Sequence, residues 1–566
     1  MRFSLISLLV GTISFYSKGL CQTRFTDVSK DAGINHVFKV YEGMFGGGAC
    51  VLDYNNDGFE DLYITGGMND DQLYKNNSNG TFTNVFEQSG MTITKEYVTQ
   101  GVSGADVNRD GFVDLFLTTI TRRNKREVIP REINLLFLNN GNGSFRDVTT
   151  EYGLGDMYSF STGGSFGDFN ADGWPDIYVG NYFNEYKGKL SVINDNTVVE
   201  ANQIAKGYLL LNEKGKKFRD VYSDYGLDFR GFGFGAVFTD FDNDSDQDLL
   251  VSHDFGYKRT PNKLLENRFP KKSFADISKE MKMDIRINAM GSAVGDYNND
   301  GLMDYYVTNI KFNYFMINQG AGKPFVNKAT ELGLGFFAIS WGANFADFDH
   351  DGDVDLFVAN GDLNPNCVAM ADFYFENLGN KFQDNARAYG LADYGIGRGS
   401  VTFDYDNDGD LDLLVINQAP QLNYPVESFT RLYRNDSTGG NWIKIALKGA
   451  EAESRGIGSK IEVEAGGKKM IREIDGGGSS HISQNSVIAH FGLGKAEKID
   501  KITVYWTGGN KQTLTSVPGN QLITITEIPA KKSNNFFVYL TGGLAFILLV
   551  FIYLIKGKKI MKPHWI

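Results

Sequence analysis

The stretch DYNNDGFED at residues 53–61 decides the fold, because the same pattern recurs six more times along the chain. The further copies are DVNRDGFVD from Asp106, DFNADGWPD from Asp168, DFDNDSDQD from Asp240, DYNNDGLMD from Asp296, DFDHDGDVD from Asp347 and DYDNDGDLD from Asp404. Successive copies begin 51 to 72 residues apart. Self-similarity at such a period indicates a repeat architecture.

Apolar segments that flank each copy repeat as well. An apolar strand follows the pattern, as in LYITG (62–66), and then comes a third element, from LYKNN (73–77) to LYRND (432–436). A fourth element such as FTNV (82–85) completes the unit. Four short strands joined by polar turns are typical of a propeller blade, and no 3.6-residue apolar period favours a helical solenoid.

The fourth element also predicts how the ring of blades closes. Six units contain it, whereas the seventh ends with LYRND, and a matching segment, FTDV (25–28), precedes the first unit. We expect residues 25–28 to pair beside residues 432–436, which would leave no exposed sheet edge. The sequence therefore predicts an all-β fold with a seven-bladed β-propeller over residues 22–438.

The nine-residue pattern places oxygen donors at its odd positions: side chains at positions 1, 3, 5 and 9, and the backbone carbonyl at position 7. An oxygen-only set suits a hard cation, and its flexible geometry favours calcium over magnesium. Glycine at position 6 allows the turn with φ > 0, but the loop from Asp240 has Ser245 there. Position 12 of the first copy is Ile64, within a strand, so the loop is not an EF-hand.

About seven calcium sites with a mainly structural role follow from this pattern, since no copy has a neighbouring base or nucleophile. The alternative is that the loops are simple polar Asx-turns. The predicted ligands are Asp53, Asn55, Asp57, Phe59, Asp61, Asp106, Asn108, Asp110, Phe112, Asp114, Asp168, Asn170, Asp172, Trp174, Asp176, Asp240, Asp242, Asp244, Asp246, Asp248, Asp296, Asn298, Asp300, Leu302, Asp304, Asp347, Asp349, Asp351, Asp353, Asp355, Asp404, Asp406, Asp408, Asp410 and Asp412.

The charge of the chain agrees with cation binding. The net charge of the 566 residues is −13, and residues 22–530 alone carry 48 basic and 69 acidic residues. A nucleic-acid-binding protein needs a basic surface to displace the counterions of phosphate groups. This acidic body excludes that class of partner.

Both ends of the chain carry targeting patterns. Residues 1–21 have the basic, apolar and small-residue order of a signal peptide, although a buried strand is an alternative. After a linker at 531–535, the uncharged residues 536–555 are long enough for a transmembrane helix. The lysine-rich tail, 556–566, predicts a cytoplasmic C-terminus and a periplasmic or extracellular body. Residues 536–566 are alternatively a cleaved sorting signal.

Residues 439–530 break the repeat and predict a small β domain. IEVEAGGKKMIREI (461–474) has the pattern of a hairpin that turns at Gly466 and Gly467. His481 and His490 lack a paired acid, so we interpret them as packing or turn residues. Cys50 is expected to be a buried thiol and Cys367 a loop thiol, with no disulfide.

The repeats resemble FG-GAP/VCBS repeats, the calcium-loop blades that integrin α-subunit heads also contain. RGIGSKIEV (455–463), HFGLG (490–494) and ITVYWTGG (502–509) resemble the ASPIC/UnbV domain, with Thr507 where a proline often stands. The combination is similar to the cartilage acidic protein family and its bacterial relatives. The resemblance implies a seven-bladed propeller with a ligand-binding surface, and a small β domain without established chemistry.

These patterns predict a calcium-stabilised, membrane-anchored recognition or adhesion scaffold that binds a protein or a polysaccharide on a propeller face. The long inserts after the second and third loops are candidates for contact with a ligand; the first carries a basic cluster, for which an ordinary solvated loop is the alternative. The chain has no nucleophile elbow, no HExxH motif and no acid pair distinct from the loops, so we predict no enzymatic activity. The alternatives are a polysaccharide lyase or hydrolase, and an assembly factor for a membrane complex. The basic cluster consists of Arg122, Arg123, Lys125, Arg126 and Arg131.

Overall fold

The structure is a computed structural model that describes residues 25–41, 45–123, 130–184, 204–362, 367–420 and 423–529. The predicted signal peptide, linker, transmembrane helix and tail lie outside the described residues. Within these ranges, no helix combines the length and the apolar character needed to cross a membrane.

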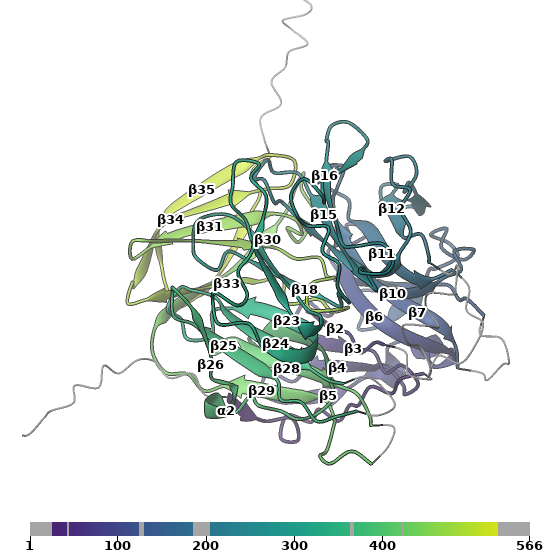
Figure 1. The fold of residues 1–566 in the computed structure, drawn as a ribbon, viewed down its shortest axis with the longest axis horizontal. Coiled ribbons are helices and arrows are strands. Elements are labelled where there is room, and N and C mark those ends of the chain that lie inside the picture. Colours follow the sequence, from purple (N-terminus) through teal and green to yellow (C-terminus); the bar gives the residue numbers. More distant parts are fainter. Residues whose placement is uncertain are drawn as a thin grey trace, which may run out of the picture. The chain divides into compact units, whose positions relative to one another are not determined.

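Seven antiparallel sheets carry the repeats (Figure 1). Their strands are, sheet by sheet, β2 (Ala49–Leu52), β3 (Asp61–Ile64), β4 (Gln72–Asn76) and β5 (Phe82–Asn84); β6 (Tyr97–Ala105), β7 (Asp114–Arg122), β8 (Leu135–Asn139) and β9 (Phe145–Asp147); β10 (Phe160–Gly167), β11 (Asp176–Phe183), β12 (Tyr208–Asn212) and β13 (Phe218–Asp220); β14 (Phe232–Thr239), β15 (Asp248–Asp254), β16 (Lys263–Asn267) and β17 (Phe274–Asp276); β18 (Ser292–Gly295), β19 (Asp304–Val307), β21 (Tyr314–Ile317) and β22 (Val326–Asn327); β20 (Ile310–Phe312), β23 (Phe337–Ala346), β24 (Asp355–Asn360), β25 (Phe373–Asn377) and β26 (Phe382–Asp384); and β27 (Gly397–Phe403), β28 (Asp412–Asn417), β29 (Arg431–Asn435) and β1 (Phe25–Asp27).

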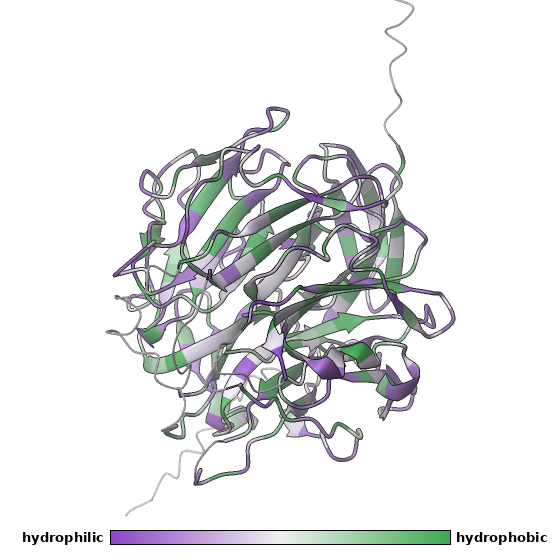
Figure 2. Ribbon diagram, turned by 90° about the vertical axis from the view of Figure 1, so that its right-hand side faces the viewer, coloured by the Kyte–Doolittle hydropathy of each residue, from purple (hydrophilic) through white to green (hydrophobic). Residues whose placement is uncertain are grey.

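Helices are few among the described residues, and the fold is all-β and propeller-like. The short helices are η1 (Phe86–Gln88), η2 (Thr92–Glu96) and α2 (Ala386–Tyr389). The repeated sheets are meanders, because each polar turn connects neighbouring antiparallel strands. The first strands β6, β10 and β14 are buried along their whole length, and hydrophilic residues concentrate in the loops (Figure 2).

The N-terminal strand completes the last sheet of the repeat, as predicted. β1 pairs with β29 in antiparallel register, with Phe25 opposite Asn435 and Asp27 opposite Tyr433. The hydroxyl of Thr26 also donates a hydrogen bond to the carboxylate of Asp436, 2.5 Å away. Segments about 400 residues apart in the sequence therefore form one sheet.

The core is divided among pairs of successive sheets. One cluster joins the first sheet to the last, and contains Leu62 and Tyr74 together with Val401 and Leu414. Equivalent clusters lie between each following pair of sheets. The hydrophobic effect therefore holds each sheet against two neighbours.

Residues 441–527, which we call the C-terminal module, form two further sheets. One has the order β33 (Ala489–Gly494), β30 (Asn441–Lys448), β36 (Leu522–Thr526), and the other the order β32 (Lys468–Glu473), β31 (Lys460–Ala465), β34 (Lys498–Tyr505), β35 (Lys511–Pro518). The hairpin predicted at Gly466 and Gly467 is confirmed, with φ of 59° and 83°. The module and the repeats share one compact unit that ends at Glu527.

Residues 476–485 of this module connect it to the repeats. They lie between the first strands of the seven sheets and contact them through both backbone and side chains. The amide N–H of Val51 donates to the carbonyl of Gln484 at 3.2 Å, and the amide N–H of Phe166 donates to the carbonyl of Gly476 at 2.8 Å. We call these residues the plug. Its further contacts reach Gly104, Ala236, Ser292, Asn344, Ser400 and Thr402.

Candidate metal centres in seven acid loops

Each copy of the nine-residue pattern joins the first strand of a sheet to the second. We number these acid loops in chain order: loop 1 (53–61), loop 2 (106–114), loop 3 (168–176), loop 4 (240–248), loop 5 (296–304), loop 6 (347–355) and loop 7 (404–412). The ninth position is always the first residue of the second strand, as Asp61 is for β3. The sheet therefore anchors one end of each set of carboxylates.

The backbone of each loop folds around its own carboxylates. In all seven loops, the amide N–H of position 6 donates to the carboxylate of position 1 at 2.8–3.2 Å. The amide N–H of position 7 donates to the carboxylate of position 5 at 2.8–3.1 Å. Ser245 adopts the same conformation as the glycines at position 6, with φ of 73°, so loop 4 keeps its turn.

An asparagine that ends each third strand, or directly follows it in the case of Asn318 after β21, holds the ninth-position aspartate. Its amide N–H donates to that carboxylate at 2.7–2.8 Å in all seven sheets. Its side-chain amide donates to the carbonyl at position 2 of the preceding loop at 2.7–3.0 Å, and the asparagine of the first sheet bonds to loop 7. These residues are Asn76, Asn139, Asn212, Asn267, Asn318, Asn377 and Asn435.

The role of these asparagines is not evident from the repeat pattern, although the pattern contains them. Each of the third elements, from LYKNN to LYRND, contains an asparagine at the corresponding place. The pattern shows that the residue recurs. Its bond to the preceding loop depends on sheets that are neighbours only in space.

The first- and ninth-position aspartates are buried, with the first-position Asp53 of loop 1 as the half-buried exception. Burial, and to a lesser extent the neighbouring carboxylates, raise the pKa of Asp61 to about 8 and that of Asp347 to about 8. Burial likewise raises the pKa of Asp168 to about 7. A buried cluster of like charges is unfavourable unless a cation compensates it.

Several buried carboxylate oxygens in the loops have no hydrogen-bond partner among the described residues. They belong to Asp176, Asp246, Asp304, Asp347 and Asp406, one in each of loops 3 to 7. Because a buried polar atom without a partner is costly, each of these oxygens is available for a cation.

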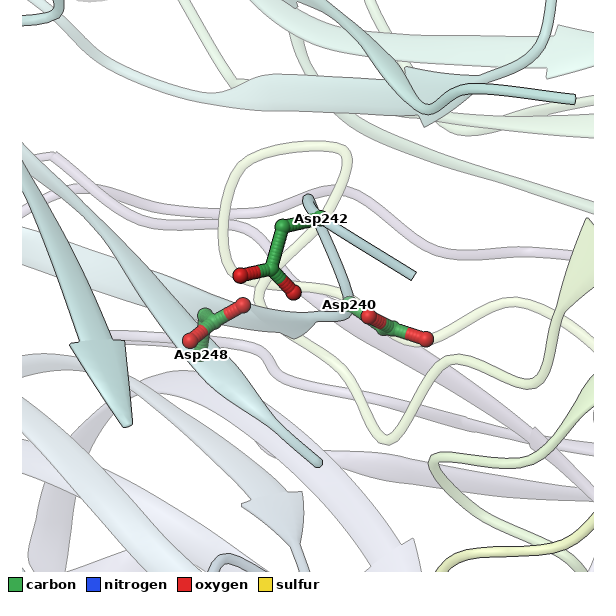
Figure 3. A group of neighbouring side chains, drawn as sticks. All are labelled: Asp240, Asp242 and Asp248. Atoms are coloured by element: carbon green, nitrogen blue, oxygen red, sulfur yellow. The ribbon is translucent and has the colours of Figure 1, made fainter. Parts of the chain in front are cut away.

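Three loops bring three carboxylates together within 4.8 Å. The groups are Asp240, Asp242 and Asp248; Asp347, Asp349 and Asp351; and Asp404, Asp406 and Asp412. Figure 3 shows the first group, in which two side chains come from the loop and the third from the start of β15. The fifth-position Asp244 and Asp408 and the ninth-position Asp355 do not belong to these groups.

The other four loops have asparagine at position 3, and the same backbone hydrogen bonds shape them. In these loops the amide N–H of position 5 donates to the side-chain oxygen of that asparagine at 3.0–3.2 Å. At position 7 the predicted ligand is the backbone carbonyl. The backbone N–H of the same residue donates to the fifth-position carboxylate within the turn. The donor set of all seven loops, oxygen without nitrogen or sulfur, fits a hard divalent cation.

The C-terminal module contacts the acid loops, although loop residues such as Asp57 and Asp244 remain exposed. In loops 2, 4, 6 and 7 it donates a hydrogen bond to the first-position aspartate, at the same carboxylate oxygen that accepts the N–H of position 6. The donors are the hydroxyl of Ser454 at 3.0 Å, the ammonium of Lys460 at 2.8 Å, the amide N–H of Gly492 at 2.9 Å and the ammonium of Lys444 at 2.5 Å. First-position aspartates therefore face both the loop and the module.

The remaining predicted residues are mostly structural. His481 and His490 are buried and contact the carbonyls of Met290 and Gly409, which confirms the packing interpretation. Arg122 and Arg123 form ion pairs with Glu96, Glu132 and Asp70. Cys50 is buried and Cys367 is half-buried, and neither is in a disulfide. Lys125 and Arg126 lie outside the described residues.

Family models match both parts of the chain. The FG-GAP-like repeat model matches residues 53–117, 120–179 and 296–358, and the model described as ASPIC and UnbV matches residues 449–532. The chain contains FG-GAP-like repeats and an ASPIC/UnbV domain. The repeat model matches three separate stretches, whereas the acid loops and sheets extend the pattern from β1 to β29.

Curated relatives from Xenopus tropicalis, Homo sapiens and Mus musculus bear the name cartilage acidic protein 1. The Xenopus tropicalis protein is 25% identical over 430 residues, which cover 72% of this chain and 61% of that protein. The Homo sapiens protein is 25% identical over 377 residues, which cover 64% of this chain and 52% of that protein. The chain thus spans a little over half the length of the Xenopus tropicalis and Homo sapiens proteins.

Solved structures resemble the chain only distantly. One of them is the Bacillus licheniformis rhamnogalacturonan lyase, which is 11% identical in sequence with a TM-score of 0.36. The match covers 77% of this chain and 78% of the lyase. This similarity is too low to support a conclusion about this chain.

Proposed function

We propose that the chain is a calcium-stabilised recognition scaffold that acts outside the cytoplasm. The observation that carries the calcium proposal is the repeated set of buried, oxygen-only loops with unpartnered carboxylate oxygens. Calcium accepts such ligands from carboxylates, amides and carbonyls. The ions would hold like charges together and fix the turn between the first two strands of each sheet.

The seven sheets would be the blades of one closed, seven-bladed propeller. This proposal is supported by the pairing of β1 with β29, by the core cluster between the first and last sheets, and by the asparagine bonds that run from each sheet to the preceding loop. A closed ring has no free sheet edge, which suits a rigid scaffold.

The recognition surface would lie at the end of the sheets away from the acid loops, because the C-terminal module packs against the end that carries the loops. Antiparallel connectivity places the links after second and fourth strands at this opposite end. Exposed aromatic residues lie at this end: Tyr158 and Tyr257 in two of the links, and Phe312 and Phe337 on the paired strands β20 and β23 of one sheet. Phe312 and Phe337 are 54% and 63% exposed, with ring centroids 5.9 Å apart.

Exposed aromatic side chains are typical anchors of binding surfaces. The ligand would be a protein or a polysaccharide that packs against these rings. Replacement of both Phe312 and Phe337 by serine should reduce retention of the ligand in glycan and protein pull-downs, while the melting temperature stays within about 2 °C of the wild type. Unchanged retention by the double variant would contradict this assignment of the surface.

A binding function is favoured over an enzymatic one by the state of the histidines. All five histidines in the described ranges are buried, and burial lowers the pKa of His36, His253 and His481 to about 4. Such groups are not placed to exchange protons with a ligand at neutral pH. A polysaccharide lyase or hydrolase remains the alternative, and turnover of a bound glycan by the purified protein would favour it.

The proposal includes an anchor at the C-terminus, which rests on residues 536–566 of the sequence. A protease added outside intact cells or spheroplasts should digest the body and spare the lysine-rich tail. Protection of the body would contradict the proposed orientation. A mature protein that lacks the tail, as measured by mass spectrometry, would instead favour a cleaved sorting signal.

A further inference from the structure

The acid loops fall into two classes by charge. Loops 4, 6 and 7 have aspartate at all five odd positions, whereas loops 1, 2, 3 and 5 have three aspartates each. A divalent ion would therefore leave three uncompensated aspartate charges in each five-aspartate loop, against one in each of the others, with Glu60 adding a negative charge to loop 1 and Arg109 a positive charge to loop 2. An excess of buried like charge destabilises the folded state.

Each five-aspartate loop receives one lysine from the C-terminal module. Lys444, on β30, donates to the first-position Asp404 of loop 7 at 2.5 Å and to the side chain of Asn407 at 2.9 Å. Lys460, on β31, donates to the first-position Asp240 of loop 4 at 2.8 Å and also to the side chain of Asn243. The two ammonium groups thus bind the same pair of positions, 1 and 4, in two different loops.

The third lysine occupies a different place in loop 6. Lys468, at the start of β32, lies 2.8 Å from the carboxylate of Asp353 and donates to the carbonyl of Asp351 at 2.8 Å. In this loop position 4 is His350, so the pair of acceptors used by the other lysines is missing. The positive charge is supplied at position 7 instead.

The four loops with three aspartates lack this contact. Within the described ranges, no lysine or arginine of the C-terminal module forms an ion pair with them, and Ser454 contacts loop 2 through a neutral hydroxyl. The extra carboxylates and the lysines therefore occur together. Lys444 and Lys460 are 7% and 8% exposed, so solvent screens their ion pairs little.

We propose that loops 4, 6 and 7 are composite cation sites, each completed by a lysine of the C-terminal module that acts as a fixed counter-ion and lowers the affinity of the loop for calcium. The inference rests on the proposed calcium function. A positive charge beside a cation site opposes the binding of a second cation, and this opposition is strong where water is excluded. The three lysines would thus set the calcium affinity of three loops, and their removal should leave the other four unaffected, because the module reaches those loops through other residues such as Ser454, Arg455 and Arg472.

The test is a calcium titration by calorimetry on the chelator-treated full chain, with Lys444, Lys460 and Lys468 each replaced by methionine, singly and together. Methionine keeps most of the apolar stem and removes the charge. Each change should tighten calcium binding at one loop by about tenfold, and the triple variant should tighten three sites while four keep the wild-type affinity.

Two controls separate charge from packing. Lys501→Met removes a lysine that pairs with Glu464 inside the module at 2.7 Å, so it should leave every calcium affinity unchanged. Lys444→Arg keeps the charge and should also retain the wild-type affinity. If the buried changes prevent folding, Lys468→Met still tests the inference in loop 6, because that lysine is 41% exposed.

The outcomes distinguish this inference from the proposed function. Wild-type protein that binds no calcium would overturn both. Wild-type protein that binds calcium, with unchanged or weaker binding in the lysine variants, would overturn the composite sites and leave the calcium proposal intact.

Discussion

At the scale of the residue, seven asparagines at or directly after the ends of the third strands connect each sheet to the acid loop of the preceding sheet. Each one satisfies a buried carboxylate of its own sheet and a buried carbonyl of the preceding loop, as Asn139 does for Asp114 and Tyr54. A backbone carbonyl buried without a partner costs more free energy than a typical hydrogen bond contributes. These residues therefore connect the acid loops to each other and to the sheets.

Replacement of one such asparagine should lower stability measurably. Asn139→Ala leaves the carbonyl of Tyr54 without its side-chain donor, and we expect the free energy of unfolding to fall by about 1–3 kcal/mol in urea denaturation. The matched control is Asn140→Ala, because Asn140 is exposed and bonds only to Ser144 within its own turn. Equal costs for the two variants would contradict the role of Asn139.

His36 provides a residue-scale test of pH dependence. It is buried, with Nε2 3.1 Å from the carbonyl of Thr65 and Nδ1 2.7 Å from the hydroxyl of Thr430, and burial lowers its pKa to about 4. Only the neutral ring can donate to the carbonyl and accept from the hydroxyl at once. A base whose pKa is lowered on folding stabilises the protein above its unfolded pKa of 6.5, and this stabilisation is lost as the pH falls from 6.5 towards 4.

We therefore expect the wild type to lose about 1–3 kcal/mol more than His36→Gln when the pH is lowered from 7 to 4.5. The measurement is chemical denaturation of both proteins at each pH. A variant that loses stability in parallel with the wild type would show that His36 does not contribute to the pH dependence.

At the scale of the element, the N-terminal strand β1 completes the last sheet of the repeat by pairing with β29. Deletion of Phe25–Val28 removes the partner of β29, so the amides of β29 should exchange hydrogen much faster, although they lie about 400 residues away. Deletion of residues 22–24 alone is the control and should leave that exchange unchanged. Protection of β29 in the absence of β1 would mean that the last sheet does not depend on the N-terminus.

The turn of loop 4 offers a second test at this scale. Ser245 has φ of 73°, which glycine adopts without the steric cost of a side chain. Ser245→Gly should therefore raise the free energy of unfolding by about 0.5–1 kcal/mol. Gly58→Ser in loop 1, where an added Cβ has no atom within 4 Å, should lower it by a similar amount. Changes of the same sign at both positions would contradict this account of the turn.

The sequence was sufficient to predict the elements that repeat, because a recurring pattern reports local structure. The strands, the acid loops and the pairing of β1 with β29 follow from segments such as FTDV and LYRND that can be compared along the chain. Contacts made once could not be predicted in this way. The plug and Lys444 lie in a module without internal repeats, and their contacts depend on how that module packs against the sheets.

At the scale of the whole molecule, the C-terminal module is part of the scaffold and not an appended domain. The plug contacts the first strands of the seven sheets, and the lysines of the module neutralise the loops with the most aspartates. The aspartates of the acid loops thus carry a large negative charge, and the lysines of the chain neutralise only part of it. The central claim is that calcium supplies the rest.

The most direct test is to measure the calcium content of the purified protein by elemental analysis, together with its melting temperature with and without chelator. The account predicts about seven calcium ions per chain. It also predicts a fall of more than about 10 °C on chelation, since each ion that binds only the folded state adds about 2.7 kcal/mol at a hundredfold excess over its dissociation constant. A protein that contains no calcium and melts at the same temperature with and without chelator would contradict the claim.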